Sequence, residues 1–206
     1  EREVAMEIDA NLRCAGFERP AFDTIVASGP NSALPHAQPS ARVFTEGDIV
    51  LLDFGGVLDG YCVDLSRVAT IGAPSEVALR LHSAVKAAQA AAITAVRPGV
   101  WASDVDGAAR RVLEESGLGE AFGHGTGHGL GLEIHEDPRI SKRDSDHERA
   151  IAEGADVLLA PGMVFTVEPG AYEPGQGGVR IEDDVLVTDE GSELLTEVSR
   201  ELWVQS

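Results

Sequence analysis

Cysteines are scarce in this sequence, and their positions exclude a disulfide framework. The chain has two cysteines in 206 residues, Cys14 and Cys62, which lie far apart and form no C-x-x-C motif. Small secreted proteins that depend on disulfide bonds carry several cysteines at close spacing. We therefore predict that both thiols are reduced and buried or half-buried, and that the protein is cytoplasmic.

Long apolar runs are also absent, and basic residues are few compared with acidic ones. No apolar run approaches the roughly 20 residues that a membrane-spanning helix requires. Lysine and arginine together number 16, against 35 aspartates and glutamates, and the net charge is −19. A surface this acidic repels the phosphates of nucleic acids and of anionic membranes. The sequence therefore predicts no nucleic-acid or membrane partner.

The pattern of apolar residues predicts one α+β domain over residues 1–206. Helical spacing and boundary signals predict helices over residues 1–15, 76–96 and 103–116, the last opening with a capping-box-like Ser103-x-x-Asp106. Short runs bounded by turns predict strands at 23–28, 49–54, 61–70, 163–168 and 179–187, the second and third joined as a hairpin. We expect the charged interval 141–156 to be an exposed loop with a short helical turn.

A glycine-rich stretch with three histidines, AFGHGTGHGLGLEIHE (residues 121–136), is the most unusual part of the sequence. Glycines let the backbone bend sharply and approach a ligand closely. His124, His128 and His135 are spaced by four and seven residues, so their rings can turn toward one point. The H-E-x-x-H helix of zinc proteases is excluded, because a helix would not tolerate so many glycines. Alone, the stretch is also compatible with a turn-rich loop whose imidazoles are solvated.

Four acidic residues end or interrupt apolar strands. Asp53 ends IVLLD, Asp64 interrupts YCVDL, Glu168 ends MVFTVE and Glu182 interrupts GVRIED. A buried carboxylate is costly unless it is paired or bound to a metal. Each acid alone is compatible with a structural salt bridge or a strand-end cap. All four together, with a glycine-flanked histidine, favour a metal centre.

This ligand set predicts a binuclear centre. Four carboxylates and one imidazole suit Mn, Fe, Co or Zn, and they are too many for one ion unless some of them bridge two. Two bridged ions with a shared hydroxide are suited to hydrolysis of a stable bond such as an amide. We expect the remaining histidines, His36, His124 and His135, to be hydrogen-bond partners or proton carriers.

Four motifs together resemble the metal-dependent pita-bread peptidases: LLDFGG-x7-DLSR, FGHGTGHGLGLEIHE, GMVFTVEPGAY and GGVRIEDDVLVT. This family includes proline dipeptidases, aminopeptidases P, methionine aminopeptidases and the metal-free creatinases. The match extends from about Asp23 to Trp203 in the family's order. The resemblance implies a curved antiparallel sheet flanked by helices. It also implies two divalent metal ions, with Mn first and Co, Zn or Fe as alternatives.

The resemblance implies a role for each metal ligand. Asp53 would chelate one ion, His128 and Glu168 would bind the other, and Asp64 and Glu182 would bridge both. The hydroxide between the ions would attack the scissile carbonyl, and Glu168 would shuttle its proton.

Four further residues match positions around the substrate in this family. His135 resembles the histidine that binds the substrate carbonyl and stabilises the tetrahedral state. His36 resembles a histidine that faces it across the cleft, and His124 matches a histidine of the pocket wall. Arg180 matches an arginine just before the bridging Glu182, where it would pair with acidic groups or with the substrate's terminus.

Two sequences favour the proline-peptidase branch of this family: NSALPHAQP (residues 31–39) and GHGTGHGLGLEIHE-x-P. We therefore predict hydrolysis of the Xaa-Pro peptide bond by an Xaa-Pro dipeptidase. Three alternatives remain: an aminopeptidase P acting on longer Xaa-Pro-Xaa peptides, a methionine aminopeptidase, and a non-catalytic peptide-binding relative. The last is disfavoured because all five ligands are present. A dipeptidase needs a group that grips the free C-terminal carboxylate, and the sequence does not reveal which group does so.

The sequence departs from the family's pattern in two places. We expect the N-terminal domain that usually precedes this catalytic domain in the family to be absent, and the first helix to be truncated. The charged interval Lys142–Asp156 is longer than the family's usual link. It is either a surface excursion without consequence or a contact that substitutes for missing elements. Because relatives commonly dimerise, we also expect a homodimer.

Overall fold

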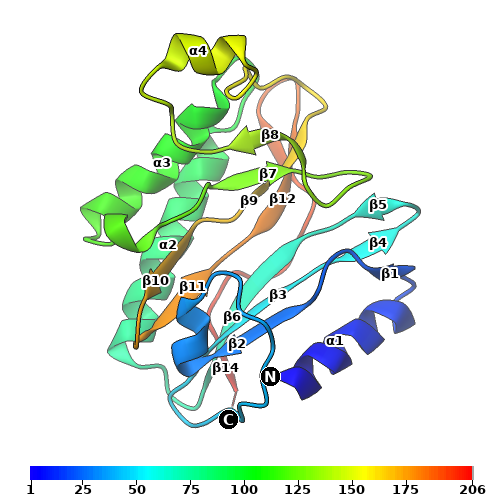
Figure 1. Ribbon diagram of the computed structural model, residues 1–206, viewed down its shortest axis with the longest axis vertical. Helices are drawn as coiled ribbons and strands as arrows, with labels where there is room; N and C mark the ends of the chain where they lie inside the picture. The colour runs from blue at the N-terminus through cyan, green and yellow to red at the C-terminus, as the bar shows by residue number, and fades with distance from the viewer. Residues whose placement is uncertain (206) are drawn as a thin grey trace.

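A long antiparallel hairpin formed by β3 (Ile49–Phe54) and β6 (Leu65–Ile71) is the centre of the structure. The computed structural model describes residues 1–205, and the hairpin belongs to a four-stranded sheet of order β14-β6-β3-β2. β2 (Ile25–Ser28) pairs antiparallel with β3, and β14 (Trp203–Gln205) pairs parallel with β6. Figure 1 shows these strands in the lower half of the molecule.

The two arms of the hairpin continue as β4 (Gly56–Leu58) and β5 (Tyr61–Cys62). The connecting turn has positive φ at both central residues, 51° at Asp59 and 81° at Gly60. This is the backbone of the two-residue turn that favours Asp-Gly, so the hairpin predicted from VLDG is confirmed. β1 (Arg19–Pro20) pairs with β4 and completes a three-stranded sheet.

The second large sheet has five strands in the order β13-β12-β9-β7-β8. Its strands are β7 (Gly127–Gly129), β8 (Glu136–Ile140), β9 (Val164–Val167), β12 (Asp183–Val187) and β13 (Ser192–Leu194). A separate two-stranded sheet consists of β10 (Gly170–Glu173) and β11 (Gly177–Arg180). Among residues 1–205, all strand pairings are antiparallel except that of β14 with β6, and this mixture of helices and antiparallel sheets agrees with the predicted α+β fold.

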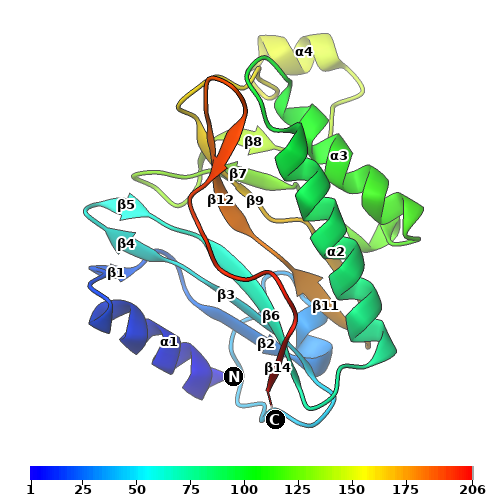
Figure 2. The same ribbon diagram turned by 180° about the vertical axis from the view of Figure 1, so that it is seen from behind.

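Helices cover both sides of the sheets. α2 (Glu76–Ala95) and α3 (Ala102–Glu115) pack side by side behind them, as Figure 2 shows, while α1 (Arg2–Cys14) lies beside β2. Shorter helical segments are η1 (Gly29–Ala33), η2 (Gly119–Ala121) and α4 (His147–Ala152). Within residues 1–205, every helix is too short or too polar to cross a membrane.

Alternation along β3 divides its apolar side chains between two cores. Leu51 belongs to the main core, which also contains Leu81 of α2 and Phe165 of β9. Val50 points to the opposite face and packs with Ala5 of α1 in a smaller core. Asp53, two residues after Leu51, points to the same face of the strand as Leu51 and is buried.

Two strands predicted as continuous are interrupted where an acidic residue occurs. The strand expected at 61–70 stops at Cys62 and resumes at Leu65, and the strand expected at 179–187 stops at Arg180 and resumes at Asp183. At the first break, the Asp64 backbone N–H donates to Asp184 Oδ2 at 3.1 Å instead of to a neighbouring strand. The breaks carry Asp64 and Glu182 out of the regular sheet alternation.

The capping box predicted at Ser103 and Asp106 is wrong. The N-cap of α3 is Trp101, whose N–H donates to Asp104 Oδ2 at 3.4 Å. Asp106 is fully buried and accepts from the Thr126 N–H at 3.0 Å and the Thr126 hydroxyl at 2.9 Å, besides pairing with Arg110. Asp106 therefore fixes the start of the histidine-glycine stretch rather than the start of a helix.

The histidine-glycine stretch contains a central strand rather than only a loop. A Cβ on Gly127 of β7 would lie 1.8 Å from the Thr166 carbonyl oxygen, and one on Gly129 would lie 2.3 Å from the Asp137 carbonyl oxygen. Only glycine permits so close a backbone approach. The glycines therefore let β7 fit between β8 and β9, with His128 at its centre.

The charged interval is a surface excursion that contains α4, as predicted. Asp156 anchors it on α3: its Oδ1 accepts from the Ser103 N–H at 3.1 Å, and its Oδ2 lies 2.8 Å from His147 Nε2. Arg143 adds a contact to Asp104 at 2.6 Å. In Figure 1 this segment projects at the top of the molecule.

Candidate metal centre and active site

One cavity of about 420 Å³ is lined by all nine residues selected from the sequence: His36, Asp53, Asp64, His124, His128, His135, Glu168, Arg180 and Glu182. The proposed ligands come from separate parts of both large sheets. Asp53 is the penultimate residue of β3, His128 is in β7 and Glu168 follows β9. Asp64 and Glu182 lie at the two strand breaks. The fold therefore brings together five ligand candidates that span more than half of the chain.

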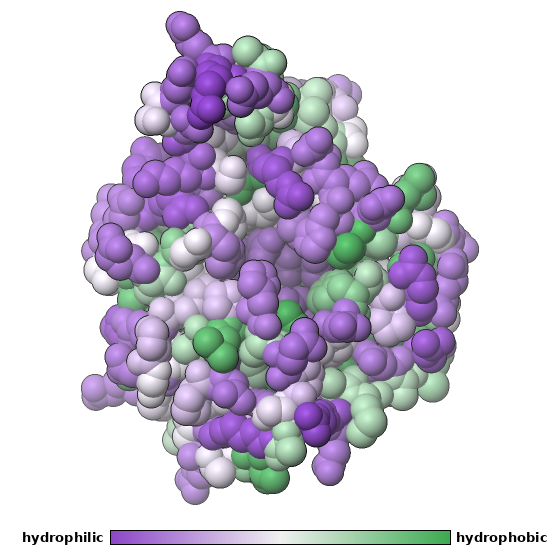
Figure 3. Space-filling view, viewed as in Figure 1, coloured by the Kyte–Doolittle hydropathy of each residue, from purple (hydrophilic) through white to green (hydrophobic). Residues whose placement is uncertain are grey.

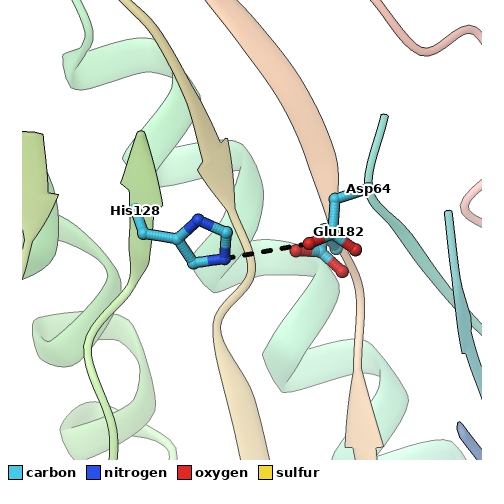
Figure 4. A group of neighbouring side chains, drawn as sticks. All are labelled: Asp64, His128 and Glu182. Carbon is cyan, nitrogen blue, oxygen red and sulfur yellow. Dashed lines mark ion pairs between the residues drawn. The ribbon is translucent and has the colours of Figure 1, made fainter. Parts of the chain in front are cut away.

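Three of these side chains form a tight cluster, shown in Figure 4. Asp64, His128 and Glu182 each offer one ligand atom, and these atoms all lie within 4.8 Å of one another. His128 Nε2 lies 3.8 Å from Asp64 Oδ2 and 3.6 Å from Glu168 Oε1. This geometry gives the cluster a neutral nitrogen ligand beside oxygen ligands, a set that suits first-row divalent metals.

The orientation of His128 is fixed by the backbone. Its Nδ1 lies 3.0 Å from the Gly129 carbonyl oxygen, which accepts the Nδ1–H. Burial lowers the pKa of His128 to about 4, so the ring is neutral at physiological pH. The lone pair of Nε2 then faces the carboxylates, which is the arrangement of a metal-ligating histidine.

The carboxylates repel one another in a buried place. Burial, followed by the charges of Asp53 and Glu168, raises the pKa of Asp64 well above its usual range. Burial and the charge of Asp64 raise the pKa of Glu182 in the same way. Burial also raises the pKa of Glu168 to about 7, against the opposing charge of Arg180. A bound cation would relieve this repulsion.

Two carboxylate oxygens of the cavity have lone pairs that no described residue uses. Asp53 Oδ1 and Asp64 Oδ1 are buried and have no hydrogen-bond partner among residues 1–205. Unpartnered buried carboxylate oxygens are costly, and hard divalent cations prefer such ligands. The residues present therefore fit a divalent metal ion.

Comparison with known proteins identifies the family of the chain. The profile of metallopeptidase family M24 matches residues 1–189. The chain belongs to metallopeptidase family M24. It is 44% identical over 202 residues to the Xaa-Pro dipeptidase of Pyrococcus furiosus, a match that covers 98% of this chain and 55% of that protein.

Solved structures with this fold carry related names. The X-Pro aminopeptidase of Thermotoga maritima has a TM-score of 0.92 and 43% identity, and it matches 100% of this chain with 55% of its own. A dipeptidase of Pyrococcus horikoshii also has a TM-score of 0.92, with 44% identity over 100% of this chain and 54% of its own. The M24 chain thus spans about half the length of these relatives.

Arg180 holds the wall of the M24 site in place. It is buried, with 3% of its surface exposed, and its guanidinium pairs with the Asp53 carboxylate. It also donates to the Tyr172 hydroxyl at 2.7 Å and to the Ser66 hydroxyl at 3.0 Å. Ser66 in turn donates to Glu182 Oε2 at 2.7 Å. Arg180 therefore orients two of the proposed ligands, one directly and one through Ser66.

His124 is held by protein groups on both ring nitrogens. Its Nδ1 lies 2.7 Å from the Gly125 carbonyl oxygen, and its Nε2 lies 3.0 Å from the Tyr172 hydroxyl. Burial lowers its pKa to about 4, so the neutral ring donates to Gly125 and accepts from Tyr172. His124 lines the cavity as predicted, but both of its ring nitrogens are already hydrogen-bonded within the protein, to Gly125 and to Tyr172.

The other two histidines present their rings more freely. His135 and His36 are exposed residues on the cavity wall. The His135 ring centroid lies 4.3 Å from that of His128, with the planes 64° apart. Both rings therefore lie on the cavity wall near Asp64, His128 and Glu182, and their predicted role toward a substrate stays a prediction.

Arg139 is a cavity residue that the sequence did not single out. It lies directly across from His128 in the β7–β8 pairing, and its exposed side chain lines the cavity. No acidic side chain among the described residues pairs with it. The sequence predicted no strand at Glu136–Ile140, so this cross-strand pairing was not predicted. The cavity also has an apolar wall formed by Phe22, Ile25 and Ile134.

Proposed function

We propose that this M24 chain hydrolyses the Xaa-Pro peptide bond with divalent metal ions bound by Asp53, Asp64, His128, Glu168 and Glu182. The observation that carries the proposal is the convergence of these five side chains on one cavity in which two carboxylate oxygens lack partners. The Xaa-Pro dipeptidase and X-Pro aminopeptidase names of the relatives support the same reaction.

The proposed centre holds two ions, with Mn²⁺ first and Co²⁺, Zn²⁺ or Fe²⁺ as alternatives. His128 and Glu168 would hold one ion, Asp53 the other, and Asp64 and Glu182 both. Bound ions would supply an activated water and polarise the scissile carbonyl. Arg180 occupies one oxygen of Asp53, which leaves Asp53 Oδ1 to face an ion.

Glu168 is the proposed proton carrier. Hydrolysis adds water across the C–N bond, and the leaving proline nitrogen must gain a proton. Glu168 lines the cavity with the other ligand candidates, and a carboxylate beside a bound water can accept a proton and return it to the leaving group. His135 and His36 would donate hydrogen bonds to the substrate carbonyl as charge develops on its oxygen.

Arg139 supports a preference for dipeptides. Its guanidinium lines a cavity with several acids, yet none of the described residues pairs with it. A free C-terminal carboxylate of an Xaa-Pro dipeptide is a ligand that a guanidinium binds in a bidentate manner. The second candidate is an aminopeptidase P, in which residues follow the proline, and the X-Pro aminopeptidase of Thermotoga maritima favours it.

The proposed function also includes the domain organisation, the assembly and the location of the protein. We propose residues 1–206 as one catalytic domain, a homodimer as the assembly and the cytoplasm as the location. A proline-containing peptide is the proposed partner of the cavity.

The experiment compares three peptides under one condition: Ala-Pro, Ala-Pro-Ala and Met-Ala-Ser. Each is incubated with Mn²⁺ and, in parallel, with a chelator. We expect Mn²⁺-dependent cleavage of Ala-Pro above all. Cleavage of Ala-Pro-Ala alone would favour an aminopeptidase P, and cleavage of Met-Ala-Ser alone a methionine aminopeptidase. Metal binding without cleavage of any peptide would contradict the proposed reaction and favour a non-catalytic relative.

A further inference from the structure

The carboxylate of Glu1 is buried and fully hydrogen-bonded at the start of α1. Its Oε1 accepts from the Ser28 N–H and the Ser28 hydroxyl, both at 2.8 Å. Its Oε2 accepts from the Ser40 N–H at 2.9 Å and the Ser40 hydroxyl at 2.5 Å. Asn31 Nδ2 lies 3.0 Å from Oε1 and 3.3 Å from Oε2. One side chain thus receives hydrogen bonds from three residues 27 to 39 positions away.

These partners lie at the two ends of one active-site loop. We call residues 29–41 the His36 loop; Ser28 immediately precedes it, and Ser40 is near its end. The Glu1 carboxylate therefore bridges the outgoing and returning legs of the loop. The backbone nitrogens of Glu1 and Arg2 add contacts on the returning leg, to the Arg42 and Ser40 carbonyl oxygens, respectively.

The tip of the His36 loop is part of the cavity wall. Pro35 and His36 line the cavity, and the Pro35 carbonyl oxygen accepts from Arg180 at 3.2 Å. Among the described residues, none makes a hydrogen bond to the His36 ring. The place of that ring is therefore set by the loop backbone, which the Arg180 hydrogen bond to Pro35 holds at the tip and Glu1 holds at the base.

We propose that Glu1 is a positioning residue that holds the His36 loop closed so that His36 faces the metal cluster. This inference rests on the proposed function of the site. Glu1 is not among the residues that line the cavity, so its proposed effect on the reaction passes through the loop that carries His36. The hydrogen bonds that Glu1 accepts lower its pKa to about 2, against the opposing effect of burial, so the carboxylate stays charged at neutral pH.

The substitution Glu1→Gln tests the carboxylate with little change of size. An amide has one acceptor oxygen and one NH₂ group, so the NH₂ would face donors at either Ser28 or Ser40. One leg of the loop would then be released. Glu3→Gln is the matched control, because Glu3 is exposed on the same first turn of α1.

The experiment is a double-mutant cycle with His36→Ala, assayed on Ala-Pro with saturating Mn²⁺. We expect Glu1→Gln to lower kcat/KM by about ten- to hundredfold, the scale of a small displacement of an active-site group. Metal content stays unchanged, and Glu3→Gln behaves as the parent. In the His36→Ala background, Glu1→Gln should change kcat/KM by less than about twofold, because its effect passes through His36.

Equal losses from Glu1→Gln with and without His36 would overturn the proposal and leave Glu1 a purely structural role. Amide hydrogen exchange is the readout that does not require activity. We expect faster exchange in the His36 loop of the Glu1→Gln variant and unchanged exchange in residues 49–54. Unchanged exchange in the loop would overturn the proposal even if no peptide were cleaved. If Glu1→Gln does not fold, Ser40→Ala makes the same test with one hydrogen bond removed.

Discussion

The guanidinium of Arg180 binds one carboxylate oxygen of Asp53 and leaves the other buried without a partner. Burial alone would lower the pKa of Arg180, but Tyr172, Asp53 and the neighbouring acids raise it well above its usual value. Arg180 therefore stays charged and holds Asp53 in one orientation. The unpartnered oxygen of Asp53 is the one that a metal ion would use.

Arg180→Lys should weaken metal binding although it keeps the positive charge. A lysine ammonium cannot reach Asp53, Tyr172 and Ser66 at once, because it lacks the planar fork of the guanidinium. We expect metal affinity and kcat/KM to fall by about 10- to 100-fold, the usual effect of losing a residue that orients metal ligands. Calorimetric titration with Mn²⁺ measures the affinity. Arg111→Lys, on the exposed side of α3, is the control.

His128→Ala and His135→Ala should separate metal binding from catalysis. Loss of His128 should remove most bound metal and abolish activity. Loss of His135 should leave metal content intact and lower kcat by about 10²-fold, as expected for a hydrogen-bond donor in the transition state. Elemental analysis and steady-state kinetics check both. A His128→Ala variant with the metal content and rate of the parent would refute the ligand assignment.

Arg139→Ala should raise the KM for Ala-Pro by about 10- to 100-fold, because a charge-assisted hydrogen bond to the substrate carboxylate is lost. The KM for Ala-Pro-Ala should change little, since its carboxylate lies one residue further away. Arg139→Lys should give an intermediate KM. Equal increases of KM for both peptides would mean that Arg139 does not recognise the dipeptide carboxylate.

Acid should remove the stability that Glu1 contributes. The pKa of Glu1 is about 2 in the folded protein and 4.5 in its unperturbed state. Its contribution is therefore fully present above about pH 4.5 and is lost as pH falls toward 2, with an upper bound of about 3 kcal/mol. Urea unfolding of the parent and of Glu1→Gln should give free energies that differ at pH 7 and converge near pH 2. A constant difference across this range would contradict the prediction.

Asp156→Asn should destabilise the charged excursion without affecting catalysis. Asp156 is buried and binds both the Ser103 N–H and His147, and neither contact reaches the cavity. We expect a loss of about 1–3 kcal/mol in the free energy of unfolding, the scale of leaving buried polar groups without their partners. The kcat on Ala-Pro should stay the same. A large loss of kcat at unchanged metal content would show that the excursion acts on the site.

The sequence predicted the elements that depend on local patterns. The strand at residues 49–54 and the Asp59–Gly60 turn follow from an apolar run and from turn chemistry, and both are confirmed. The candidate site residues also came from the sequence, because acids in apolar strands are unusual and the motifs resemble a known family. All of them line one cavity.

Features that depend on tertiary contacts were not predicted. Asp106 looked like a helix cap, but it binds Thr126, which lies 20 residues away. β7 was not predicted, because glycines usually indicate a turn, whereas here they allow the strand to lie very close to the neighbouring backbone. Arg139 lies at the cavity because β8 pairs it with His128. The Glu1 carboxylate accepts a hydrogen bond from Ser40, which lies 39 residues away. Local sequence patterns contain none of these relationships.

The most direct test of the account is the initial rate of Ala-Pro hydrolysis as metal-free protein is titrated with Mn²⁺. We predict no cleavage without metal, a rate that rises to a plateau at two equivalents of Mn²⁺, and loss of that rate on addition of a chelator. Cleavage that persists in the metal-free protein, or Mn²⁺ binding that never produces cleavage of Ala-Pro, would contradict the account.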